Sequence, residues 1–169
     1  EGLKGAEFVF PTVSVGATEN LLMAATLADG RTVLSNAARE PEIVDLGQCL
    51  ISMGADISGL GSSEIVINGV RELGGTSHAV LPDRIETGTY AIAAAIAGGE
   101  LELTGTREEL IGALAELLRK TGSEVSATNR GIKIARNGAR PSAVSVATEP
   151  FPGFPTDLQA QYMALMATA

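Results

Sequence analysis

An internal repeat is the feature that most constrains the fold of this sequence. Residues 21–69, which begin LLMAATLADGRTV and end EIVING, can be laid over residues 91–138, which begin AIAAAIAGGELEL and end GIKIARNG. The matched positions include glycines and apolar residues: Gly30 with Gly99, Gly54 with Gly122, and Ile65 with Ile132. A repeat of this period corresponds to a whole supersecondary unit, so the same series of helices and strands should occur twice.

Each copy carries the signals of a β-α-β-α-β-β unit. An apolar helix that ends at a glycine is expected at about residues 17–28 and again at 86–97. A short strand and an amphipathic helix follow, and a hairpin closes the unit. The predicted strands are residues 7–10, 32–34, 56–58 and 64–67 in the first unit, and about 77–80, 100–103, 124–127 and 131–135 in the second.

The two kinds of helix differ in the side chains around their circumference. Residues 91–97 are apolar on every side, and such a helix has to be surrounded by other elements. The second helix of the later copy has one apolar stripe, formed by Leu110, Ile111, Leu114, Leu117 and Leu118. We therefore expect an α/β fold with apolar helices inside, and with sheets and amphipathic helices outside.

A third copy begins within residues 144–169 and stops inside its first helix. Natural domains seldom end at such a point. We interpret the chain as a fragment of a longer protein, built from two units and the start of a third.

Charge, composition and motifs argue against several classes of function. The net charge is −8 and the longest basic cluster is Arg119-Lys120, whereas nucleic acid demands a basic face. The single Cys49 excludes an intrachain disulfide, and the single His78 argues against a metal site. The patterns GxxxxGK[ST], GxGxxG and GxSxG are absent. The sequence shows no signal peptide and no bilayer-spanning run, so we expect a cytoplasmic protein.

Four motifs together carry a resemblance to a known family. They are TVSVGATENLLMAATLA, NAAREPEIVDL, LPDRIETGTY and FPTDLQAQ, in this order along the chain. From Leu3 to Ala169 the sequence resembles the UDP-N-acetylglucosamine 1-carboxyvinyltransferase family of enolpyruvyl transferases. The resemblance implies an inside-out α/β barrel of six such units in two domains. Residues 1–82 would be the last unit of one domain, and residues 83–169 would open the other.

The resemblance also implies an activity and a set of site residues. The family transfers the enolpyruvyl group of phosphoenolpyruvate to the 3′-hydroxyl of UDP-N-acetylglucosamine, in peptidoglycan precursor synthesis, and needs no metal or organic cofactor. Asp157 matches a carboxylate that contacts the sugar and takes the proton from this hydroxyl. The residues that match the contacts to the uridine diphosphate are Thr12, Val13, Ser14, Val15 and Gly16. Thr12 stands where members of the family commonly have a lysine.

Other interpretations stay open at this point. Ser14-Val15-Gly16 also fits a turn that only caps a helix, and Asp157 also fits an N-cap. The family's reactive cysteine would lie upstream of Glu1, and Cys49 does not match it, so we expect the chain alone to be inactive. The alternatives are a non-catalytic repeat fragment and a sibling transferase of the 3-phosphoshikimate 1-carboxyvinyltransferase type. The apolar helix faces would favour self-association of such a fragment.

Overall fold

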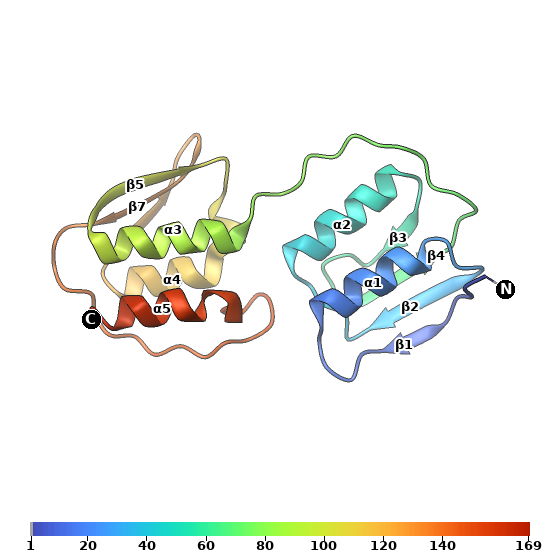
Figure 1. The fold of residues 1–169 in the computed structure, drawn as a ribbon, viewed down its shortest axis with the longest axis horizontal. Coiled ribbons are helices and arrows are strands. Elements are labelled where there is room, and N and C mark those ends of the chain that lie inside the picture. The colour runs from blue at the N-terminus through green and yellow to red at the C-terminus, as the bar shows by residue number, and fades with distance from the viewer. Residues whose placement is uncertain (1) are drawn as a thin grey trace. The chain divides into compact units, whose positions relative to one another are not determined.

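The computed structural model describes residues 2–169 and divides them into two units, with the boundary between Leu81 and Pro82 (Figure 1). Each unit has its own sheet and its own hydrophobic core. Within residues 2–169, no helix combines the length and the apolar character needed to cross a bilayer. Whether the two units belong to different domains of a longer protein stays a prediction.

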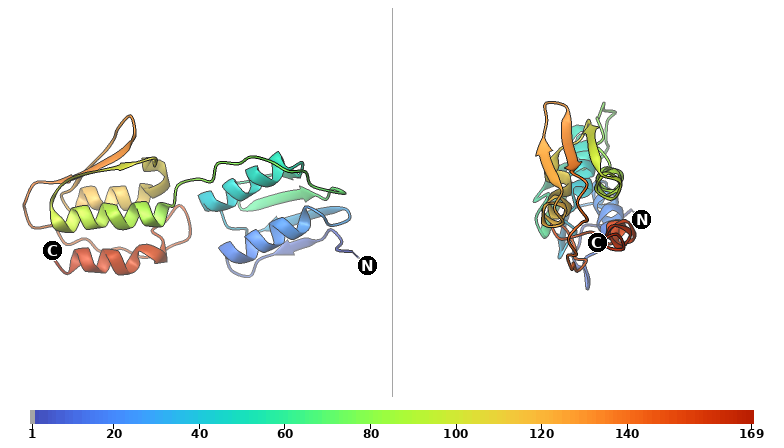
Figure 2. Two further views of the ribbon diagram at one scale, coloured as in Figure 1. Left: turned by 45° about the horizontal axis from the view of Figure 1, so that its top comes forward. Right: turned by 90° about the vertical axis from the view of Figure 1, so that its left-hand side faces the viewer.

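The first unit is a four-stranded sheet with two helices on one face (Figures 1 and 2). Its elements are β1 (Glu7–Val9), α1 (Val15–Ala25), β2 (Arg31–Ser35), α2 (Pro41–Ser52), β3 (Asp56–Ser58) and β4 (Glu64–Asn68). The strand order is β1-β2-β4-β3, in which β1 runs parallel to β2 and the other neighbours are antiparallel. Leu22 of α1 and Ile43 of α2 are fully buried against Ile65 and Ile67 of β4 within one core.

The second unit repeats this plan with three helices and a three-stranded antiparallel sheet of order β5-β7-β6. Its elements are α3 (Arg84–Ala97), β5 (Gly99–Thr104), the 3₁₀ turn η1 (Glu108–Ile111), α4 (Gly112–Lys120), β6 (Glu124–Ala127), β7 (Gly131–Arg136), the 3₁₀ turn η2 (Thr156–Leu158) and α5 (Gln159–Met166). Helix α5 lies beside α3 and shares its core, in which Ile92, Leu118 and Leu165 are fully buried (Figure 2).

The repeat of the helices and hairpins is confirmed, whereas the apolar helix α3 is surrounded only in part, since Ala93 and Ala97 are exposed. Gly54 and Gly122, which follow the two amphipathic helices, have φ angles of 106° and 95°, a conformation that favours glycine. The five apolar side chains of the predicted stripe on η1 and α4 are all buried. Ala91 and Ala95 of α3 are fully buried as well, whereas Met23 of α1 is exposed.

The predicted strand at residues 77–80 is wrong. Residues 69–83 contain no strand, and one edge of β5 has no neighbouring strand within residues 2–169. The segment is instead held on the first unit. Val70 N donates to Thr26 O at 2.8 Å, Gly74 N donates to Met53 O at 2.7 Å, and His78 Nε2 lies 3.0 Å from Asp45 Oδ1. These contacts hold the segment against the first unit, and none of them is a backbone hydrogen bond to β5.

Helix α1 also ends three residues earlier than predicted, at Ala25 rather than residue 28. Ala28 N donates to Ala25 O, which tightens the chain into a turn, and Asp29 N donates to Leu3 O at 2.8 Å. In a longer helix Asp29 N would donate to Ala25 O, and its hydrogen bond to Leu3 O takes the place of that bond.

Candidate functional site

The parallel pair β1 and β2 brings two loops to the same edge of the first sheet. The pairing places Phe8 beside Leu34, so the loops that follow the two strands leave in the same direction. Both helices of the unit begin at this edge (Figure 1). We call residues 10–16 and 36–40 the β1–β2 edge. Ligands of α/β proteins commonly bind outside the carboxyl ends of parallel strands.

Side-chain hydrogen bonds hold the two loops together. Asn36 Nδ2 donates to Phe10 O at 2.9 Å, and Phe10 N donates to Ser35 O at 3.0 Å. Asn36 has a φ angle of 57°, a left-handed conformation that asparagine tolerates better than most residues. The start of one loop is thereby fixed against the start of the other.

Ser14 caps the first helix of the site. Its hydroxyl accepts a hydrogen bond from Ala17 N at 3.3 Å, and its carbonyl accepts one from Thr18 N at 3.0 Å. The interpretation as a capped turn is therefore confirmed. The amides of Val15 and Gly16 have no acceptor within residues 2–169. Free amides at a helix N-terminus suit an anion, so capping and anion binding are compatible here.

The remaining predicted contacts surround this helix entrance. Thr12, Val13 and Gly16 are exposed, whereas Ser14 and Val15 are half-buried. Thr12 carries no charge, so it adds nothing to the positive potential that the N-terminus of α1 supplies.

Thr18 is a buried member of the edge that sequence reasoning missed. Its side chain is fully buried, its hydroxyl donates to Ser14 O at 2.7 Å, and the same hydroxyl accepts from Ala38 N at 3.1 Å. One hydroxyl therefore connects the entrance of α1 to the loop before α2. The signal that could have found it is Thr87, which stands at the matching place in the second copy.

Asp157 lies in the second unit, within η2 at the start of α5. Its side chain is exposed and makes no hydrogen bond or ion pair with residues 2–169. The N-cap interpretation is wrong, because Pro155 occupies that position and no side chain caps the turn. An uncommitted carboxylate in the first turn of a helix is available to a ligand.

The segment before Asp157 is held by aromatic packing. The rings of Phe154 and Tyr162 meet edge to face with centroids 5.4 Å apart, and Tyr162 Oη donates to Val144 O at 2.9 Å. Burial raises the pKa of the Tyr162 hydroxyl, which keeps it protonated as a donor.

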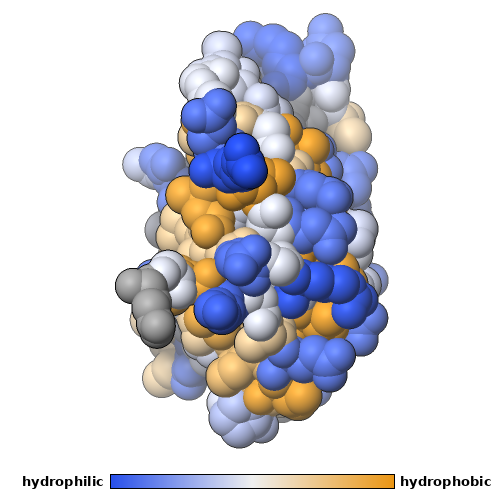
Figure 3. Space-filling model, turned by 90° about the vertical axis from the view of Figure 1, so that its right-hand side faces the viewer, coloured by the Kyte–Doolittle hydropathy of each residue, from blue (hydrophilic) through white to orange (hydrophobic). Residues whose placement is uncertain are grey.

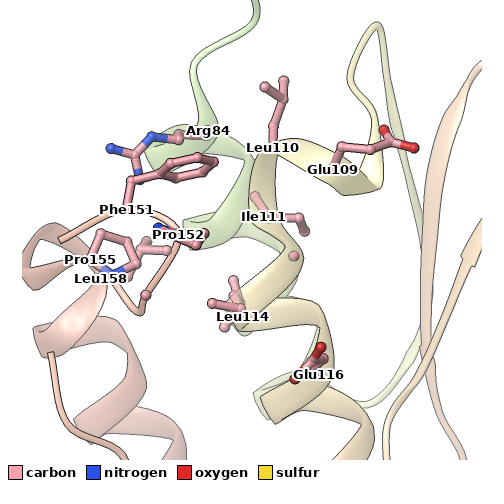
Figure 4. Close-up of a pocket in the computed structure, with 13 residues that line it drawn as sticks. Arg84, Glu109, Leu110, Ile111, Leu114, Glu116, Phe151, Pro152, Pro155 and Leu158 are labelled. Atoms are coloured by element: carbon pink, nitrogen blue, oxygen red, sulfur yellow. The ribbon is translucent and has the colours of Figure 1, made fainter. Parts of the chain in front are cut away.

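A hollow of about 370 Å³ opens on the same unit, with Pro155 and Leu158 on one side (Figure 4). The guanidinium of Arg84 lies beside the ring of Phe151 at its rim, and Leu114 of α4 lies on the opposite wall (Figure 4). The hollow has an apolar floor, and Asp157 does not line it.

Two residues with reactive side chains lie away from these features. Cys49 is a free, half-buried thiol on α2, and His78 contacts Asp45. Among residues 2–169, no group of three or more His, Cys, Asp or Glu side chains is arranged to hold a metal ion.

Solved structures define the class of fold. The enolpyruvyl transferase NikO from Streptomyces tendae matches with a TM-score of 0.78 at 24% identity, over 92% of this chain and 37% of that chain. EPSP synthase from Acinetobacter baumannii matches with a TM-score of 0.56 at 24% identity, over 98% of this chain and 36% of that one. The fold is therefore that of the enolpyruvyl transferases, and the predicted α/β class is confirmed.

The sequence shows the family. Residues 1–169 match the family described as EPSP synthase (3-phosphoshikimate 1-carboxyvinyltransferase), and the chain belongs to this family.

Two relatives are named UDP-N-acetylglucosamine 1-carboxyvinyltransferase. The one from Cereibacter sphaeroides is 66% identical over 168 residues, and the one from Methylorubrum extorquens is 61% identical over 168 residues. Both alignments cover 99% of this chain, which spans 40% and 39% of the lengths of these relatives. The resemblance seen in the four motifs is confirmed.

Proposed function

We propose that this chain is part of an enzyme that transfers the enolpyruvyl group of phosphoenolpyruvate to the 3′-hydroxyl of UDP-N-acetylglucosamine. The observation that carries the proposal is the 66% identity, over 99% of the chain, with a relative of that name. The reaction belongs to peptidoglycan precursor synthesis and would take place in the cytoplasm. Because the chain spans only 40% of that relative, we expect residues 1–169 alone to be inactive.

In this proposal the β1–β2 edge binds the uridine diphosphate. The free amides of Val15 and Gly16 and the positive end of α1 suit a diphosphate. Thr12 and Val13 are exposed beside them, and the Ser14 hydroxyl keeps acceptor and donor capacity beyond its cap. The binding would rest on backbone amides, because Thr12 brings no cation.

Asp157 is the general base of the proposed reaction. Its carboxylate takes the proton of the 3′-hydroxyl while the hydroxyl oxygen bonds to C2 of phosphoenolpyruvate, and the methylene carbon takes a proton from a group outside residues 1–169. Loss of a proton from the resulting methyl group and departure of phosphate then restore the double bond. A carboxylate that is exposed and engaged by no neighbour within residues 2–169 suits this role.

The acceptor is tested with the full-length protein. Phosphate release is measured with phosphoenolpyruvate and either UDP-N-acetylglucosamine or shikimate 3-phosphate, the acceptor that the family description favours. We expect phosphate release with UDP-N-acetylglucosamine as the acceptor and none with shikimate 3-phosphate. Release with shikimate 3-phosphate alone would overturn the proposal.

The role of Asp157 is tested by Asp157→Ala in the same protein. We expect turnover to fall by about 100-fold or more, with an unchanged melting temperature. Glu149→Ala is the matched control, because Glu149 is another exposed carboxylate on the segment leading to α5, and it should leave turnover unchanged. Near-normal turnover of Asp157→Ala would reject the assignment of the base.

A further inference from the structure

We infer that Thr18 is a positioning residue for the UDP-sugar site, an inference that rests on the function proposed above. Thr18 touches no ligand, since its side chain is fully buried under the entrance of α1. It acts through its two hydrogen bonds, to Ser14 O at 2.7 Å and from Ala38 N at 3.1 Å.

The two bonds tie together the parts of the site that a ligand would meet. Ser14 directly precedes the free amides of Val15 and Gly16, and Ala38 lies in the middle of the loop 36–40. Ala38 is itself fully buried, and the Thr18 hydroxyl is the partner of its amide. Without that hydroxyl, a buried amide loses its acceptor, so the loop has to shift to satisfy it.

A second cross-link makes the arrangement rigid. Asn36 Nδ2 donates to Phe10 O at 2.9 Å near the ends of the strands, and the Thr18 bonds lie farther out, at the helix entrances. Two points of attachment fix the direction of one loop relative to the other, whereas a single point leaves a hinge. Loss of the Thr18 hydroxyl would remove the outer of these two attachments.

The second unit holds a matched control. Thr87 stands at the same place of the repeat, donates to Asp83 O at 2.8 Å, and lies 3.2 Å from Thr106 Oγ1 beyond β5. The entrance of α3 is already occupied, because the Asp83 carboxylate accepts from Ile85 N at 2.7 Å and Glu86 N at 3.0 Å. A threonine hydroxyl therefore links the helix entrance to the next loop in both units. At α1 the linked entrance has free amides, whereas at α3 the Asp83 side chain accepts from the amides.

The experiment uses the full-length protein with Thr18→Val, which keeps the shape and removes the hydroxyl, and Thr18→Ser, which keeps the hydroxyl. Steady-state kinetics gives KM for each substrate and kcat, and thermal unfolding gives Tm. We expect Thr18→Val to raise KM for UDP-N-acetylglucosamine about 10-fold, with kcat within about twofold. The KM for phosphoenolpyruvate should not change, and Thr18→Ser should restore the wild-type KM.

The control separates positioning from a general loss of stability. Thr87→Val should lower Tm about as much as Thr18→Val and leave KM for the UDP-sugar unchanged. Equal KM values for Thr18→Val and the wild type, or equal KM increases in the two valine variants, would overturn the inference. If Thr18→Val does not fold, Thr18→Cys takes its place, because a thiol is a weaker hydrogen-bonding group than a hydroxyl. The same increase in KM for UDP-N-acetylglucosamine is then expected, and an unchanged KM would overturn the inference.

Failure of the proposed function gives a different result. A wild-type protein that uses shikimate 3-phosphate and not the UDP-sugar would reject the proposed substrate. The comparison of Thr18→Val with Thr87→Val would then be made on KM for shikimate 3-phosphate, and an unchanged KM would reject positioning as well.

Discussion

Gly16 lies in the first turn of α1, where a Cβ atom on its backbone would meet no heavy atom within 4 Å outside its own turn. Its φ angle is not in the left-handed region, so the fold has no need of glycine at this position. The open space next to the free amides is where the proposed diphosphate would lie. A substitution at Gly16 can therefore change ligand binding without disturbing the fold.

We predict that Gly16→Ala stabilises the full-length protein by up to about 1 kcal/mol, because alanine favours helix. The same variant should raise KM for UDP-N-acetylglucosamine about 10-fold, because the methyl group occupies ligand space. Thermal unfolding and steady-state kinetics measure the two effects. Gly112→Ala, at the equally open first residue of α4, is the control and should leave KM unchanged. An unchanged KM in Gly16→Ala would place the ligand elsewhere.

Glu102 on β5 is the residue whose charge should make stability depend on pH. Its carboxylate accepts from Thr128 Oγ1 at 2.8 Å and from Arg130 Nη2. The hydrogen bond from Thr128, and then that from Arg130, lower the pKa of Glu102 from its ordinary value of 4.5. A pKa lowered by folding contributes stability above the pKa of the unfolded chain, and this stability is lost as pH falls through the folded pKa.

We therefore predict that Glu102→Gln lowers Tm at pH 7 by a small amount, because Glu102 is only half-buried and water screens its ion pair with Arg130. The difference from the wild type should shrink as pH falls below 4.5 and vanish at lower pH. Thermal unfolding of both full-length proteins, from pH 7 to below pH 4.5, measures this difference in Tm. A difference that grows on acidification would contradict the assignment.

At the scale of elements, the end of α3 depends on one side chain of β7. Gly98, with a φ angle of 75°, ends the helix. The guanidinium of Arg136 donates to Ala95 O, to Ile96 O at 2.9 Å and to Ala139 O. Carbonyl groups at a helix C-terminus lack intrahelical donors, and the dipole favours a cation there.

We predict that Arg136→Ala lowers the free energy of unfolding by about 1.5–3 kcal/mol, the range for hydrogen bonds to a charged group. Arg136→Lys should fall between this variant and the wild type, because an ammonium keeps the charge without the planar fork. Denaturant titration of the full-length protein gives these values. Equal stability of all three proteins would show that the capping contacts contribute nothing.

Local pattern predicted most of the elements, and the failures occur where distant contacts decide. The glycines and apolar runs placed both first helices, both hairpins and the buried stripe of α4. The strand expected at residues 77–80 does not form, and His78 within it contacts Asp45 of α2 instead. The end of α1 was placed wrongly because Asp29 N bonds to Leu3 O, a partner 26 residues away in sequence.

The candidate site was predictable only in part for the same reason. The helix entrance at Ser14 follows from local sequence, since a serine before an apolar run is a common N-cap. The bond from Ala38 N to the Thr18 hydroxyl joins residues 20 positions apart, and the sign of it in the sequence is indirect, since Thr87 stands at the matching place of the repeat. The role of Asp157 came from resemblance, because as a residue before a helix it fitted an N-cap equally well.

At the scale of the whole molecule, apolar surface remains exposed on the first unit. Figure 3 shows apolar areas between hydrophilic ones on this unit. The most exposed of its large apolar side chains outside the segment 69–81 are Val9 at 68%, Leu3 at 61% and Leu27 at 54%. Apolar areas of this kind are usually covered by a partner or by the rest of the protein.

We therefore predict that a polypeptide of residues 1–169 alone self-associates. Sedimentation velocity should show dimers or larger species at micromolar concentration. Met23→Glu combined with Leu27→Glu should shift the distribution toward monomer, because Met23 on α1 and Leu27 just beyond its end are both exposed. Glu108→Gln, on the second unit, is the control. A monomer at every concentration would contradict the prediction.

The anchoring of residues 70–78 on the first unit also determines where a protease can cut. Proteases cut exposed chain that is not held in place, and Val70, Gly74 and His78 are each held by a contact to the first unit. Val80, at 77% exposure, lies just beyond the last anchor. Cleavage should therefore begin next to Val80 even though Arg71 is exposed to trypsin-like enzymes. Each of the two products would keep a complete sheet, so proteolysis would yield two folded pieces rather than a degraded chain.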